Sequence, residues 1–164
     1  MTKQRGFTLI ELMVILAVVA TVAAFGVPQI QSIMQNNRVV AALNSLSAHM
    51  QYARSEAIKR AADISIVAND PGLTNWHQGW IVFIDDDTDG IADPGEEKLR
   101  QVDALEIPNV TIMGTNRNLT FTADGSTTAT FDYIIILSDS KTGTQYTITI
   151  LSSGKISTKK LQSG

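Results

Sequence analysis

The chain of 164 residues contains no cysteine, only two histidines and few aromatic side chains. The absence of cysteine excludes disulfide bonds, so a fold outside the cytoplasm would be held by packing alone, and it also excludes catalysis by a thiol. The sequence has no G-x-S-x-G turn and no glycine-rich phosphate loop. We therefore predict that the protein is not an enzyme. His49 and His77 are interpreted as surface or packing residues, and Trp76 and Trp80 as core residues or, alternatively, as cover for a sheet edge or a subunit contact.

The charged side chains are unevenly distributed along the chain, whose net charge is −3. Residues 85–97 contain seven acidic residues and no basic one, whereas residues 155–164 contain three lysines and no acid. A net negative charge disfavours attraction of the whole molecule to nucleic acid or anionic lipid, although a local basic patch can still act.

Residues 7–27 form an apolar segment in which Glu11 is the only charged residue. A helix of this length is about 31 Å long, which matches the hydrocarbon core of a bilayer. Lys3 and Arg5 precede the segment and favour a cytoplasmic N-terminus. A secretory signal peptide, the alternative, has a shorter apolar region that ends at a cleavage site of small residues. We therefore predict a single membrane-spanning helix.

Glu11 is unusual in such a segment, because an ionised carboxylate inside a bilayer costs about 2.5–3.5 kcal/mol on insertion scales. One interpretation places Glu11 at the interface, within reach of water. The other assigns it a partner or a function.

The run from Arg5 to Leu12, RGFTLIEL, resembles the leader and mature N-terminus of type IV pilins and type II secretion pseudopilins. The resemblance implies that residues 1–6 are a leader, which a prepilin peptidase removes between Gly6 and Phe7. It also implies that Phe7 is then N-methylated, and that Glu11 neutralises the new amine of a neighbouring subunit during assembly. Removal of the leader takes away two positive charges and changes the net charge from −3 to −5.

Beyond the apolar segment, residues 28–61 are predicted to continue the helix as an amphipathic stretch. Pro28 is expected to kink or interrupt it. Apolar residues then recur at steps of three and four as far as about Arg60, which predicts one packed face. This face comprises Ile30, Ile33, Met34, Val40, Leu43, Leu46, Met50, Ala53 and Ala57.

Residues 62–164 change to short β-type runs separated by turn residues, which predicts a β-rich antiparallel head. The expected strands are 64–67, 80–84, 98–102, 110–113, 119–122, 130–137, 145–151 and 155–158. The fold class is therefore α+β, with a long N-terminal helix, membrane-spanning in its first half, packed on the head. This is the pilin architecture.

Four stretches of the chain resemble the GspH/FimT group of minor pilins and pseudopilins: ARSEAIKR (53–60), WHQGWIVFIDDDTDG (76–90), DPGEEKLR (93–100) and FTADGST (121–127). The resemblance implies a subunit in the bacterial inner membrane, with its head in the periplasm, that helps prime or assemble a type IV pilus at or near its tip. Its partners would be major and minor pilins, the prepilin peptidase and inner-membrane lipid. Alternatives are an H-type pseudopilin of type II secretion, a DNA-binding minor pilin in natural transformation, and a membrane-tethered domain whose leader is never removed.

Within the acidic loop, residues 85–97, the run 85–96 satisfies the calcium-loop pattern D-x-D-x-D-G-x5-E. The candidate ligands are Asp85, Asp87, Asp89, Asp93 and Glu96. The flanking segments are predicted strands rather than the two helices of an EF-hand, and Ala92 and Pro94 also depart from that motif. We therefore favour a solvated turn without a cofactor over a bound Ca²⁺.

The basic tail, residues 154–164, raises the alternative of DNA binding. Some FimT-type proteins bind DNA through a Gly-Arg-x-Arg motif, and the corresponding residues here are Gly154, Lys155, Ile156 and Ser157. Lys159 and Lys160 are further candidates, but lysine lacks the forked contact that arginine makes with phosphate. A solvated sheet edge is the competing interpretation.

Overall fold

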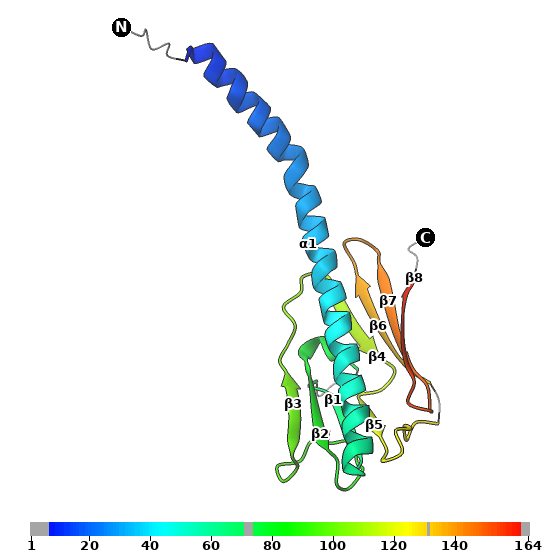
Figure 1. Ribbon diagram of the computed structural model, residues 1–164. Helices are drawn as coiled ribbons and strands as arrows, with labels where there is room; N and C mark the ends of the chain where they lie inside the picture. Colours follow the sequence, from blue (N-terminus) through cyan, green and yellow to red (C-terminus); the bar gives the residue numbers. More distant parts are fainter. Residues whose placement is uncertain (1–6, 71–73, 131, 162–164) are drawn as a thin grey trace. The chain divides into compact units, whose positions relative to one another are not determined.

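The computed structural model describes residues 7–70, 74–130 and 132–161, which form two compact units, one ending at Asn37 and the other beginning at Arg38 (Figure 1). The predicted leader, residues 1–6 with Gly6 at its end, lies outside these residues. The elements in chain order are α1 (Leu9–Arg60), β1 (Ile64–Ala68), the 3₁₀ helix η1 (Trp76–Gln78), β2 (Trp80–Ile84), β3 (Lys98–Val102), β4 (Val110–Gly114), β5 (Asn118–Phe121), β6 (Tyr133–Asp139), β7 (Gln145–Ile150) and β8 (Ile156–Leu161).

Helix α1 is continuous over 52 residues and passes through Pro28, so of the two expected effects of Pro28, a kink or an interruption, the interruption is wrong and the kink stays a prediction. A proline removes one main-chain donor, and the remaining hydrogen bonds keep the segment helical.

The part of α1 in the first unit exposes its apolar side chains. Ile30, Ile33 and Met34 are 58%, 60% and 50% exposed, so their predicted packing is wrong. The reason is that the described residues of this unit form a single helix, which offers no second element to pack against.

The part of α1 in the second unit packs its apolar face against the strands. The predicted members Leu43, Leu46, Met50, Ala53 and Ala57 are all buried, and Val40 is half-buried against the same core. Their spacing places them on one stripe of the helix, and this stripe fixes which face of α1 meets the sheets.

The strands of the second unit form two four-stranded antiparallel sheets, in the orders β3-β2-β1-β5 and β4-β6-β7-β8 (Figure 1). All eight predicted strands are present, each within a few residues of its predicted bounds. The sequence did not indicate their division into two sheets.

Trp76 and Trp80 are fully buried, so their interpretation as core residues is confirmed. The ring of Trp76 meets Tyr133 edge to face, with centroids 6.2 Å apart. His49 is half-buried with its ring 5.9 Å from that of Trp80, which confirms its packing role.

Candidate functional site

The start of α1 carries a capping box made by Thr8 and Glu11. Oε2 of Glu11 accepts hydrogen bonds from the main-chain N–H of Thr8 at 2.7 Å and from its hydroxyl at 2.8 Å. In return, the N–H of Glu11 donates to Oγ1 of Thr8 at 3.3 Å. This reciprocal arrangement satisfies donors that have no partner within the helix. Glu11 therefore has a structural role that the sequence analysis did not identify, although a threonine three residues before a glutamate is its usual signal.

The surroundings of Glu11 are apolar and open. Phe7 is 82% exposed, and it lines a shallow depression together with Glu11, Ile10, Val14 and Ile15. Both hydrogen bonds from Thr8 end on Oε2, so within the described residues Oε1 remains available to another donor. A cation at this position would meet one carboxylate with apolar side chains beside it.

Among the described residues, α1 is long and apolar enough to cross a membrane. An 18-residue window of the helix has a mean hydropathy of 2.5 and is not buried in the structure. An apolar helix with no internal partner requires either lipid or other protein around it.

The acidic loop joins β2 to β3, and it brings together three of its five candidate ligands. Carboxylate oxygens of Asp85, Asp87 and Asp89 lie within 4.8 Å of one another. Asp93 and Glu96 are not part of this group. Glu96 instead accepts hydrogen bonds from the main-chain N–H groups of Asp86 at 3.1 Å and Asp93 at 2.8 Å.

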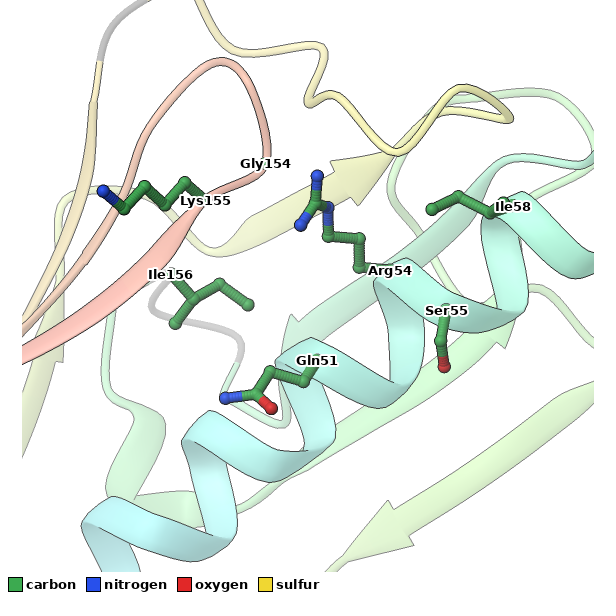
Figure 2. Close-up of a pocket in the computed structure, with 7 residues that line it drawn as sticks. All are labelled: Gln51, Arg54, Ser55, Ile58, Gly154, Lys155 and Ile156. Carbon is green, nitrogen blue, oxygen red and sulfur yellow. The ribbon is translucent and has the colours of Figure 1, made fainter.

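A pocket of about 350 Å³ lies between α1 and the turn before β8. Figure 2 shows residues that line it. Arg54 reaches from the helix and donates from Nε to the carbonyl of Gly125 at 2.8 Å and from Nη2 to that of Ser153 at 3.3 Å. Two turns are thereby attached to one helical side chain. These contacts of Arg54 could not be predicted from the sequence, because nothing local in the sequence identifies its partners.

The lysines of the basic tail do not gather on one face. Lys159 and Lys160 are successive residues of β8, and successive side chains of a strand point to opposite faces of the sheet. Nζ of Lys160 lies 5.8 Å from the centre of the Tyr146 ring. Lys155 precedes the strand, and its side chain extends away from Arg54 (Figure 2). DNA binding by these lysines stays a prediction.

Solved structures of a minor pilin resemble this chain. The type IV minor pilin FimU of Pseudomonas aeruginosa has a TM-score of 0.63 and 26% identity, over 80% of this chain and 98% of FimU. A second crystal form of FimU gives a TM-score of 0.59 and 27% identity, over 75% and 97% of the two chains. The predicted α+β pilin fold is thereby confirmed.

Curated relatives match over shorter stretches. A fimbrial protein of Pseudomonas aeruginosa is 38% identical over 64 residues, which are 39% of this chain and 41% of the relative. The pilin-like protein PilA1 of Thermus thermophilus is 30% identical over 96 residues, which are 57% of this chain and 56% of PilA1. The matches therefore span about half or less of the length of these relatives.

Two family models match separate parts of the chain. Residues 1–27 match the prokaryotic N-terminal methylation motif, and residues 42–154 match the type II transport protein GspH. The second match covers more than half of the 164 residues. The chain belongs to the GspH family, a family of structural pilin-like proteins, and the resemblance inferred from its sequence is confirmed.

Proposed function

We propose that this chain is a minor pilin that helps prime or assemble a type IV pilus at the inner membrane. The observation that carries the proposal is the single carboxylate of residues 7–27, Glu11, which lies one turn beyond Phe7 at the start of an exposed apolar helix. The methylation motif and the likeness to FimU support the same function.

Glu11 selects the docking register in this proposal. A prepilin peptidase cuts between Gly6 and Phe7, and the amine of Phe7 becomes the N-terminus and is methylated. Glu11 of an incoming subunit then pairs with the Phe7 amine of a subunit already in the filament. In apolar surroundings this pair is far stronger than in water, and an unpaired charge is costly, so one register is favoured.

This scheme also assigns a location to each segment of the chain and names its partners. Residues 7–27 span the inner membrane before assembly, and residues 28–61 continue the helix. The head, residues 62–164, lies in the periplasm. The partners are other major and minor pilins, and the subunit enters the filament at or near its tip.

The capping box allows the charge of Glu11 to be tested separately from its structural role. Glutamine is accepted at this position of a capping box, so Glu11→Gln keeps the helix start and removes the charge, whereas Glu11→Ala removes both. We expect cells without the chain to have few or no surface pili by electron microscopy. The wild type should restore pili, and both variants should fail.

Glu106→Gln is the matched control, because Glu106 is an exposed carboxylate of the head and should restore pili fully. If Glu11→Gln restored pili and Glu11→Ala did not, Glu11 would act only as a helix cap and its charge would not be needed. Normal pili on cells without the chain would contradict a pilus function, and secretion by those cells would then be measured.

A further inference from the structure

We propose that the acidic loop holds one Ca²⁺, with Asp85, Asp87 and Asp89 as its carboxylate ligands. This inference does not depend on the assembly function. It depends on how these three side chains are placed and on one buried oxygen atom.

The three carboxylates have the spacing that a single cation requires. Their oxygens lie within 4.8 Å of one another. Two oxygens bound to the same Ca²⁺ at 2.3–2.6 Å are at most about 5 Å apart, so one ion can touch all three. In the described ranges no ion pair joins any of the three to a basic side chain.

Asp85 provides the second, independent observation, because it is only 1% exposed and one of its oxygens has no partner. Its Oδ2 accepts hydrogen bonds from the Ser65 hydroxyl at 2.5 Å and the Gly90 N–H at 3.0 Å. Its Oδ1 is buried, and within the described part of the chain no donor reaches it. A buried carboxylate oxygen without a donor is costly, and a bound cation would satisfy it.

The chemistry of the group favours calcium. All three ligands are hard oxygens, and the chain has no cysteine to attract a soft metal. Ca²⁺ accepts six to eight oxygens in flexible geometry, so main-chain carbonyls and water can complete its shell. Mg²⁺ requires a nearly ideal octahedron. Asp87 and Asp89 are exposed, so water can reach the ion.

The test is a calcium titration of the full-length chain in detergent micelles, measured by isothermal calorimetry. We expect one Ca²⁺ per chain with a dissociation constant of about 10⁻⁴–10⁻³ M, as in extracellular calcium modules. The Asp87→Asn/Asp89→Asn double variant should bind at least tenfold more weakly. Asparagine keeps an oxygen for the main-chain bonds that Asp87 accepts from Asp89 and that Asp89 accepts from Ile91, so the loop should keep its shape.

Asp86→Asn is the control for position in the loop, since it removes one negative charge, where the double variant removes two, from outside the three-carboxylate group. Its affinity should stay within about threefold of the wild type. Three results would each overturn the proposal: no saturable heat up to about 10 mM Ca²⁺, equal weakening by Asp86→Asn, or equally strong binding of Mg²⁺.

Discussion

Arg54 and Gly154 form a junction between parts of the chain that are far apart in sequence. The guanidinium of Arg54 joins carbonyl groups that are 71 and 99 residues further along the chain. Gly154 has a φ of +74°, and a Cβ at this position would lie 1.9 Å from the carbonyl oxygen of Gly125. At this residue both the backbone conformation and the available space require glycine.

Gly154→Ala should therefore destabilise the protein. A left-handed conformation costs a non-glycine residue about 1–2 kcal/mol, and the clash with Gly125 adds to it, so we expect a loss of at least about 2 kcal/mol. The melting temperature should fall by roughly 5–10 °C. Gly95→Ala is the control, because a Cβ at Gly95 meets nothing within 4 Å. Equal melting temperatures for the two variants would contradict this account.

Residues differ in how well the sequence predicts their roles. The roles proposed for Phe7 and Glu11 rest on a local motif of a few letters, which can be recognised without the fold. The hydrogen bonds of Arg54 could not be predicted, because its partners lie in turns that come close to it only in the folded chain. Three of the five candidate ligands of the acidic loop come together as the spacing suggested. Glu96 instead accepts hydrogen bonds from main-chain N–H groups, which spacing alone does not reveal.

At the scale of elements, the turn after β5 depends on one ionised side chain. Oδ1 of Asp124 accepts hydrogen bonds from the Thr122 hydroxyl at 2.6 Å and from the N–H and hydroxyl of Ser126 at 2.9 and 2.7 Å. These bonds, led by that of Thr122, lower the pKa of Asp124 to about 2. The same turn presents the Gly125 carbonyl to Arg54.

The stability that Asp124 provides should depend on pH. Its pKa is lower in the folded than in the unfolded chain, so its contribution is present above about pH 4 and is lost as the pH falls towards 2. Thermal melts should show the wild type above Asp124→Asn at pH 7, with a difference that shrinks below pH 4. A difference that is unchanged at pH 2 would show that the charge of Asp124 does not matter.

The elements themselves were largely predictable. Strands β2 and β3 match their predicted bounds because glycine, proline and acidic residues delimit them sharply. The division into two sheets was not predictable, since β1 pairs with β5 across a separation of more than fifty residues. Likewise, the three-and-four spacing of apolar residues continues through Ile30 and Ile33, although both side chains are exposed. The spacing alone does not indicate where along its length a helix packs against another element.

In the whole molecule, the two units differ in how much apolar surface they expose. Almost every large apolar side chain of the described first unit is exposed, whereas the second unit has a closed core of aliphatic and aromatic residues. The first surface is suited to lipid or to a bundle of like helices, and the second unit is suited to water. In a membrane-anchored precursor that later enters a filament, the helix would be surrounded first by lipid and then by like helices, while the head stays in water.

Processing and assembly of the chain can be tested together by mass spectrometry of pili sheared from the cell surface. We expect a protein that begins at Phe7, lacks residues 1–6 and carries a methyl group on its N-terminal nitrogen. Recovery of the chain only from the membrane fraction, with residues 1–6 still attached, would contradict its processing and its assembly into the pilus.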